Sequence, residues 1–112
     1  MHELALTHEI VTVVTQAARG RRVTRVTLEV GALAGVMSDA IAFCFDAVAQ
    51  GTAVEGAALE ILAVEGRGRC RSCGQEFAAA ALYQPCLCGS HEVDLLRGGE
   101  LNVKSVEVEE AS

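Results

Sequence analysis

Four of the five cysteines in this chain form two close pairs, and these pairs strongly constrain how the second half of the chain can fold. A CxxC turn lets two thiolates converge on one metal ion, and two such turns facing each other make a closed tetrahedral site. Gly74 and Gly89 directly follow the two pairs, at positions where a tight knuckle turn requires a positive φ. The spacing predicts a zinc site held by Cys70, Cys73, Cys86 and Cys88.

The chemistry of this cysteine cluster indicates a structural ion, because a closed four-thiolate site has no open position for a substrate. Iron in a rubredoxin-like site is an alternative, since thiolates suit both metals. The second pair is C-x-C, which demands a tighter turn. His91 could replace one thiolate, but we expect it to be a solvated loop side chain. Cys44 falls on the apolar stripe of a predicted helix and is expected to be a buried, inert thiol.

The charge balance argues against a nucleic-acid partner. The 112 residues include nine Lys and Arg against fifteen Asp and Glu, a net charge of −6, whereas nucleic-acid binders are normally basic. Three arginines near the first pair, Arg67, Arg69 and Arg71, are therefore expected to offset thiolate charge. Residues 1–20 lack the features of a secretory signal, and no run reaches transmembrane length. We expect a cytoplasmic protein with reduced thiols and no membrane partner.

Hydrophobic periodicity predicts helices over residues 4–19 and 38–51, and strands over 21–31, 58–66 and 100–110. The expected fold class is α+β, with two helices on a small three-stranded sheet and an inserted four-Cys knuckle resembling a zinc ribbon. Residues 1–66 with 98–112 form the expected core domain, and 67–97 the zinc-binding insert. Glycine-rich joints at 65–69 and 97–100 bracket the insert and are interpreted as hinges.

Finer features of these elements are also predicted. Ser38 is expected to cap the second helix, and Gly20 to end the first. The apolar phase of the last strand slips between Val103 and Val106, which predicts a bulge or an exposed end. The buried stripe of the first helix is expected to hold Leu6, Ile10, Val13, Val14 and Ala17.

The first two residues offer a second set of metal ligands. The amine of Met1, the peptide nitrogen of residue 2 and the His2 imidazole can close adjacent chelate rings on one ion, and the Glu3 peptide nitrogen is a further candidate. This nitrogen-rich set suits Ni(II) or Cu(II) better than Mg(II) or Ca(II). Asp39, at the start of the second predicted helix, either complements the helix dipole or supplies an oxygen ligand.

Several stretches together resemble a known family. The start MHELAL, the segments VTLEVGALAGV and FCFDAVAQGT, the paired cysteines ending CLCGS and the tail GGELNVKSVEVE are similar to the HypA/HybF nickel metallochaperones of hydrogenase maturation. The resemblance runs essentially from end to end. It combines MHE at the extreme N-terminus with a four-Cys knuckle.

The resemblance implies how nickel is held and where it goes. His2 is the essential nickel ligand, Met1 and Glu3 contribute a main-chain nitrogen or a carboxylate, and Asp39 is a further candidate. The resemblance implies zinc at the four cysteines as a structural ion, and Ni(II) as cargo for the large subunit of [NiFe]-hydrogenase. It also implies a GTPase partner, HypB, and in some members supply to urease.

Two other classes of function are weighed against this one. The first is a zinc-ribbon module that binds protein or nucleic acid without transferring nickel; the acidity and the 4% aromatic content count against it. The second is an enzyme, either a zinc hydrolase or a redox dithiol, and the Arg-Ser between Cys70 and Cys73 does not favour a redox dithiol. A zinc hydrolase needs an open coordination site and a nearby base, and no HExxH-like motif is present. We expect a monomer or weak homodimer that is not an enzyme.

Overall fold

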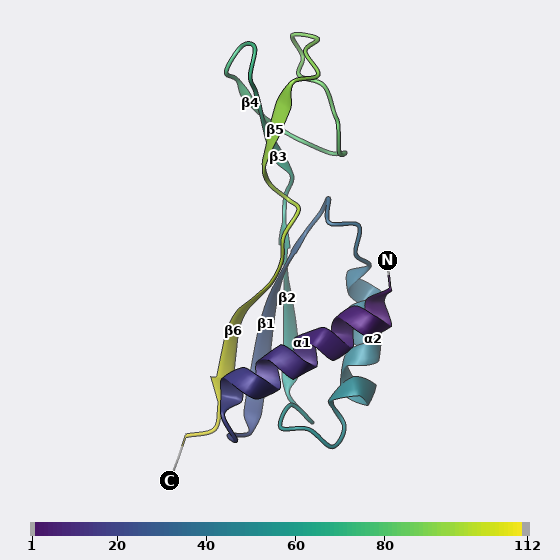
Figure 1. Cartoon of the computed structure of the whole chain (residues 1–112), viewed down its shortest axis with the longest axis vertical. Helices are drawn as coiled ribbons and strands as arrows, with labels where there is room; N and C mark the ends of the chain where they lie inside the picture. The colour runs from purple at the N-terminus through teal and green to yellow at the C-terminus, as the bar shows by residue number, and fades with distance from the viewer. Residues whose placement is uncertain (1, 111–112) are drawn as a thin grey trace. The chain divides into compact units, whose positions relative to one another are not determined.

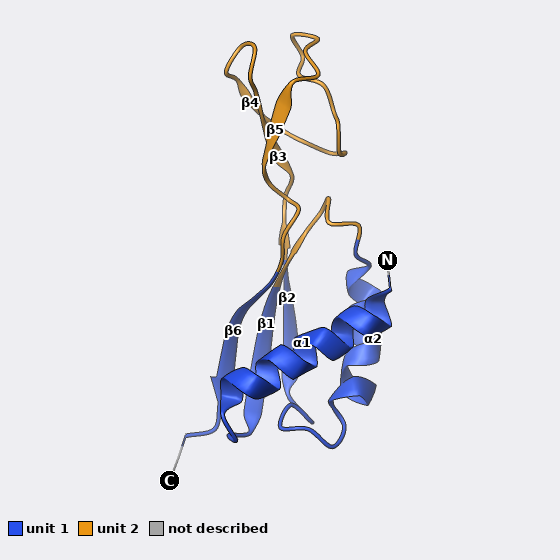
Figure 2. Cartoon of the chain, viewed as in Figure 1, with its two compact units in different colours: residues 1–28, 36–62, 102–112 blue, residues 29–35, 63–101 orange. Residues whose placement is uncertain are grey.

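The computed structural model describes residues 2–110, and the chain clusters into two compact units (Figures 1 and 2). Unit 1 comprises residues 1–28, 36–62 and 102–112, and unit 2 comprises residues 29–35 and 63–101. The α+β class is confirmed. The elements are α1 (Glu3–Ala18), β1 (Val23–Gly31), α2 (Ser38–Ala49), β2 (Ala58–Val64), β3 (Arg67–Cys70), β4 (Glu76–Ala78), β5 (Val93–Arg97) and β6 (Leu101–Val108).

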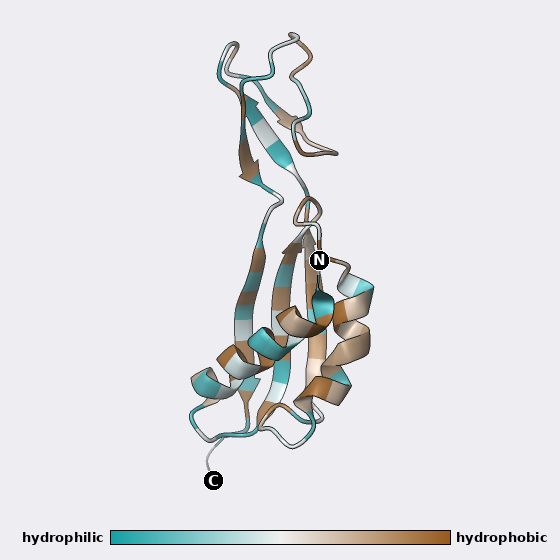
Figure 3. Ribbon diagram, turned by 45° about the vertical axis from the view of Figure 1, so that its right-hand side comes forward, coloured by the Kyte–Doolittle hydropathy of each residue, from teal (hydrophilic) through white to brown (hydrophobic). Residues whose placement is uncertain are grey.

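The core of unit 1 lies between two helices and a three-stranded sheet. The strand order β2-β1-β6 places β1 in the centre, and α1 packs against α2. Figure 1 shows α1 crossing in front of the sheet, and Figure 3 shows apolar and polar bands alternating along the strands. Each helix and the central strand contribute fully buried side chains, namely Val14, Ile41, Phe45, Val26 and Leu28. Apolar burial from three elements therefore forms one core.

The buried face of α1 differs in part from the predicted stripe. Ile10 and Val14 are buried as expected, but Val13 is 53% exposed and Ala17 is also exposed. The buried positions include Thr7, Val11 and Ala18 instead. A threonine can occupy a core position here because its hydroxyl donates a 2.7 Å hydrogen bond to the Glu3 carbonyl oxygen.

The ends of the helices show one confirmed prediction and one correction. The chain leaves α1 through Arg19 and Gly20, both with positive φ (51° and 83°), so the predicted end holds. Ser38 is not the N-cap of α2, because the helix already includes it and Met37 is the cap residue. Met37 has no capping side chain, and its N–H donates instead to the Glu3 carboxylate at 3.0 Å.

The phase slip in the last strand is confirmed by burial. The half-buried side chains of β6 are Leu101 and Val103 in one phase, then Val106 and Val108 in the other.

Ion pairs between polar side chains link the strands of unit 1. From β1, Arg25 forms 3.1 Å ion pairs with Glu60 of β2 and with Glu107 of β6.

Unit 2 contains a second three-stranded sheet, of order β4-β3-β5, that the sequence did not predict. The central strand β3 is antiparallel to both neighbours, with Gly68 opposite Phe77 of β4 and Leu95 of β5. A Cβ on Gly68 would approach Val93 Cγ1 to 2.9 Å and the Phe77 ring to 3.1 Å. Glycine at this position therefore lets two apolar side chains close over β3.

Three glycines of unit 2 meet with their backbones in direct contact. A Cβ on Gly31 would overlap the carbonyl group of Gly98, and a Cβ on Gly98 would lie 2.5 Å from the Gly66 Cα. The N–H of Leu33 donates to the Gly98 carbonyl at 2.7 Å, and the N–H of Ala79 donates to the Gly66 carbonyl at 2.9 Å. Gly66 and Gly98, one in each glycine-rich joint, are therefore buried in close backbone packing.

Candidate metal centre

Two tight turns carry the cysteine pairs, and each closes onto a glycine. The N–H of Gly74 donates to the Cys70 carbonyl at 2.9 Å, and the N–H of Gly89 donates to the Cys86 carbonyl at 2.8 Å. Both glycines have the positive φ that the sequence predicted, 76° and 93°. The C-x-C turn closes over one residue fewer than the C-x-x-C turn. In both turns the glycine after the second cysteine has a positive φ and donates its N–H to the carbonyl of the first cysteine.

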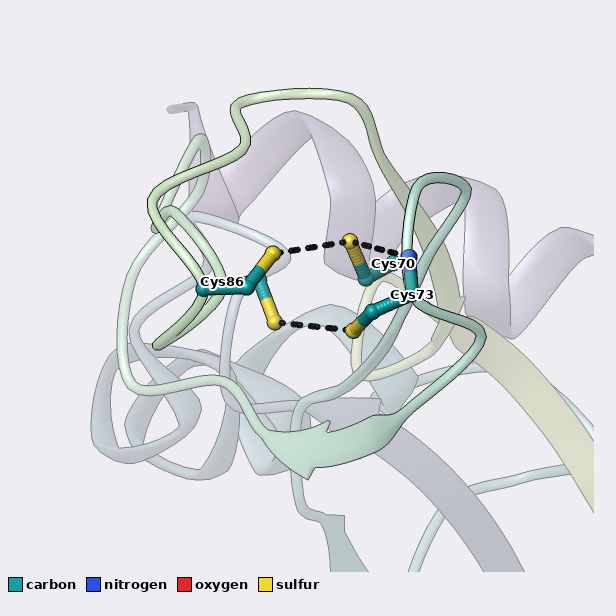
Figure 4. A group of neighbouring side chains, drawn as sticks. Cys70, Cys73 and Cys86 are labelled. Atoms are coloured by element: carbon teal, nitrogen blue, oxygen red, sulfur yellow. Dashed lines mark hydrogen bonds between the residues drawn. The ribbon is translucent and has the colours of Figure 1, made fainter.

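The four thiols converge. All four sulfur atoms lie within 4.8 Å of one another. The sulfur of Cys70 is 3.7 Å from that of Cys88, and the sulfur of Cys73 is 3.6 Å from that of Cys86. In Figure 4 the labelled cysteine side chains point toward one another. A tetrahedron with a metal–sulfur bond of about 2.3 Å has a sulfur–sulfur edge of about 3.8 Å. The donor set therefore fits a tetrahedral, thiolate-bound ion.

The electrostatics of the cluster favour a cation. The backbone N–H of Cys73 donates to the Cys70 sulfur at 3.5 Å and lowers the pKa of that thiol to about 6. At Cys86 the N–H of Cys88 also lowers the pKa, but burial and the neighbouring thiols outweigh it and raise the pKa to about 11. Four adjacent thiols cannot all ionise together without a compensating positive charge. A divalent cation would supply that charge.

Polar side chains brace the knuckle from outside. Ser72 and Ser90, one from each turn, have their hydroxyl oxygens 2.9 Å apart. The three arginines predicted to offset thiolate charge instead contact carboxylates. Arg67 and Arg69 pair with Glu76, while Arg71 pairs with Asp94.

The surface of the knuckle exposes large side chains. Leu87, between Cys86 and Cys88, is 99% exposed, and Tyr83 is 93% exposed with a φ of 63°. His91 is exposed and does not join the cluster, as expected. Cys44 is half-buried on α2, which is less burial than predicted.

The structure places the candidate nickel ligands at the beginnings of the two helices of unit 1. His2 is exposed and directly precedes α1, and its carbonyl oxygen accepts the N–H of Leu6 at 3.1 Å. Asp39 is exposed in the first turn of α2. Met1 lies outside the described residues. Within residues 2–110 the four cysteines are the one group of three or more metal-binding side chains whose donor atoms lie within 4.8 Å, so His2, Glu3 and Asp39 are not gathered in this way.

Sequence reasoning missed the hydrogen bond between Glu3 and Met37. It joins residues 34 positions apart, and no local pattern encodes such a contact. No sequence signal pointed to it, because Ser38 was the predicted cap and only the structure makes Met37 the cap residue.

A two-helix α+β unit combined with a four-thiol knuckle defines a small metal-binding protein. The family model described as "Hydrogenase/urease nickel incorporation, metallochaperone, hypA" matches residues 1–108. The chain therefore belongs to the HypA family of nickel metallochaperones, which are maturation factors and not catalytic enzymes.

The sequences of HypA proteins from other organisms match nearly the whole chain. The hydrogenase maturation factor HypA of Nostoc punctiforme is 51% identical over 110 residues, covering 98% of this chain and 97% of the relative. The HypA of Geotalea uraniireducens is 53% identical over 110 residues, covering 97% and 100%. The solution structure of the Ni metallochaperone HypA from Helicobacter pylori superimposes with a TM-score of 0.71 at 23% identity, covering 96% of this chain and 97% of that chain. That similarity shows a shared fold. No helix among the described residues is both long and apolar enough to span a membrane.

Proposed function

We propose that this chain binds Ni(II) at its N-terminus and delivers it to the large subunit of a [NiFe]-hydrogenase, in the cytoplasm and together with the GTPase HypB. The observation that carries the proposal is the family match over residues 1–108, which begins at the MHE segment. Urease is a second recipient to be tested, because the family description names both enzymes. Residues 1–66 with 98–112 would form the nickel-binding domain, and residues 67–97 the zinc-binding insert.

The proposed nickel ligands are the Met1 amine, the His2 peptide nitrogen and imidazole, and the Glu3 peptide nitrogen. Support comes from the position of His2, whose side chain is exposed just before α1. The N–H groups in the first turn of any α-helix have no intrahelical acceptor, which leaves the Glu3 nitrogen available. Ligands before a helix can exchange to another protein without disturbing a core, which suits a carrier. Asp39 is a further proposed ligand.

The second proposed ion is structural Zn(II) at Cys70, Cys73, Cys86 and Cys88. The sulfur–sulfur distances and the buried Cys70 and Cys86 support it. When bound, zinc neutralises part of the thiolate charge and links the two turns.

The test is a Ni(II) titration with metal analysis of the wild type, His2→Ala and His8→Ala. His8 is an exposed histidine on α1 and serves as the matched control. We expect His2→Ala to lose the high-affinity nickel while zinc stays at one ion per chain in all three proteins. An uncleaved N-terminal extension should act like His2→Ala, because it converts the terminal amine into an amide. Unchanged nickel affinity in His2→Ala would overturn the N-terminal site.

Delivery is tested in cells that lack their own family member. We expect the wild type, but not His2→Ala, to restore nickel to the hydrogenase large subunit, measured as metal content of the purified subunit. Restored nickel with His2→Ala would contradict the proposed route. Parallel measurement of urease nickel decides whether that enzyme is also supplied.

A further inference from the structure

The second turn of α1 contains a polar side chain buried where an apolar one would ordinarily lie. Thr7 is 0% exposed, and its hydroxyl donates to the Glu3 carbonyl oxygen at 2.7 Å. A threonine that bonds back to the carbonyl four residues earlier slightly destabilises a helix in isolation. The same contact in Thr12, which bonds to the His8 carbonyl at 2.9 Å, is exposed to solvent. The buried hydroxyl of Thr7 thus holds the carbonyl group of Glu3.

The side chain of Glu3 is engaged as well. Its carboxylate accepts the N–H of Met37 at 3.0 Å, and this N–H belongs to the cap residue of α2. In a capping box, a Glu or Gln three residues into the helix accepts the N–H of the cap residue, and here Glu3 accepts that N–H from α1.

We propose that Glu3 and Thr7 are positioning residues that hold the first turn of α1 against the start of α2, so that His2 precedes a fixed first turn. In this arrangement the carboxylate of Glu3 does not bind nickel. It acts as a brace, by which we mean that it links α1 to α2 through its hydrogen bond with the Met37 N–H. The inference rests on the proposed N-terminal nickel site, and it decides between the carboxylate and the main-chain nitrogen of Glu3 as its contribution to that site.

The physical benefit is preorganisation. Ligands that are already oriented lose less conformational entropy when a metal binds, which raises affinity without adding a metal–ligand bond. Glu3 is held at its carbonyl oxygen by the Thr7 hydroxyl and at its carboxylate by the Met37 N–H. One residue earlier, the His2 carbonyl oxygen accepts the Leu6 N–H. The imidazole of His2 remains exposed and takes part in none of these contacts.

The first test compares Glu3→Gln with Glu3→Ala. Glutamine keeps an oxygen that can accept the Met37 N–H, whereas alanine removes it. Because alanine releases the first turn of α1 from the Met37 N–H, we expect Glu3→Ala to weaken Ni(II) binding on the order of tenfold and Glu3→Gln to stay within about threefold of wild type. Equal losses in both variants would show that the carboxylate ligates nickel, and would overturn the brace.

The second test is independent of nickel. Hydrogen exchange at the Met37 amide is followed by NMR in the zinc-loaded, nickel-free protein. We expect faster exchange in Glu3→Ala and wild-type exchange in Glu3→Gln. Unchanged exchange in Glu3→Ala would overturn the brace whatever the nickel result. If His2→Ala retains nickel, the proposed function fails, and with it the positioning role, even where the exchange data still show Glu3 as a helix cap.

The third comparison isolates the buried threonine. Thr7→Val removes the hydroxyl at constant shape, Thr7→Ser restores it, and Thr12→Val removes the equivalent exposed contact. We expect weaker nickel binding and altered Ni(II) absorption bands only in Thr7→Val, with recovery in Thr7→Ser. The same loss in Thr12→Val would assign the effect to general helix stability and overturn the role of Thr7.

Discussion

One carboxylate oxygen of Asp94 accepts two hydrogen bonds from Arg71, from Nε at 2.9 Å and from Nη2 at 2.6 Å. The contact links the residue that follows Cys70 to strand β5, and it lowers the pKa of Asp94 below its usual value. The first cysteine turn is therefore attached to the small sheet of unit 2 by a charged contact as well as by the ladder of β3 with β5.

This contact predicts a pH dependence of stability. Because the folded-state pKa of Asp94 is depressed, its stabilisation is complete above the ordinary carboxyl pKa of about 4 and disappears as the pH falls through the folded value. We expect Asp94→Asn to lower the urea midpoint slightly at pH 7 and 5, and to match wild type at the acid end. Measuring both chains at each pH cancels any common loss of zinc. A difference that persisted at the lowest pH would exclude the carboxylate charge as its cause.

Loss of one cluster thiol should abolish metal binding in unit 2. We expect Cys70→Ser to lose stoichiometric zinc and to show disordered NMR signals for residues 67–97, since the proposed ion would link both turns through the four thiols. Cys44→Ser is the matched control, because Cys44 lies on α2 and is not one of the four converging cysteines. Metal analysis and a colorimetric zinc-release assay give the stoichiometry. A full complement of zinc in Cys70→Ser would mean that three thiolates suffice.

Two phenylalanines in α2 should differ sharply in how much they contribute to the free energy of unfolding. Phe45 is 2% exposed and Phe43 is 88% exposed. We expect Phe45→Ala to lower the free energy of unfolding by about 3–5 kcal/mol through lost burial and a residual cavity. Phe43→Ala should change it by less than about 0.5 kcal/mol. Urea denaturation followed by far-UV circular dichroism measures both, and similar midpoints for the two variants would contradict the packing described for α2.

The glycine contact in unit 2 predicts an intolerance to a single methyl group. Neither Gly31 nor Gly99 has a positive φ, so backbone strain is not what separates them. A Cβ on Gly31 would overlap Gly98, whereas a Cβ on Gly99 would lie 3.5 Å from Leu95, an ordinary contact. We expect Gly31→Ala to cost about 1–3 kcal/mol and Gly99→Ala to be nearly neutral. Equal stability of the two variants, measured by denaturant unfolding, would argue against the close backbone contact.

Much of the fold could be predicted because its signals are local. Helical and alternating periodicity located α1, α2, β1, β2 and β6, and the spacing of cysteines and glycines located the thiol cluster. The second sheet lacked such a signal. Strands β3 and β4 have four and three residues, too few to show an alternating pattern, and their pairing depends on Gly68 meeting Phe77.

The rest depended on contacts between distant parts of the chain. The period of α1 indicated an apolar stripe, but it could not show that Thr7 would satisfy its hydroxyl internally and be buried while Val13 stayed exposed. In the same way, the bond between Glu3 and Met37 required both helices to be in place before it could be recognised. Side-chain hydrogen bonds over long sequence separations leave no periodic trace.

Tyr83 has a consequence for observing this protein in solution. It is the one tyrosine in a chain without tryptophan, and its side chain is almost fully exposed in the segment that leads to Cys86. Tyrosine emission from the intact, unlabelled protein therefore arises from unit 2 alone, and a change in its intensity or anisotropy reports on the knuckle without any attached dye. Whatever a partner or a metal does to that segment can be followed optically, in real time and against a dark background from the rest of the molecule.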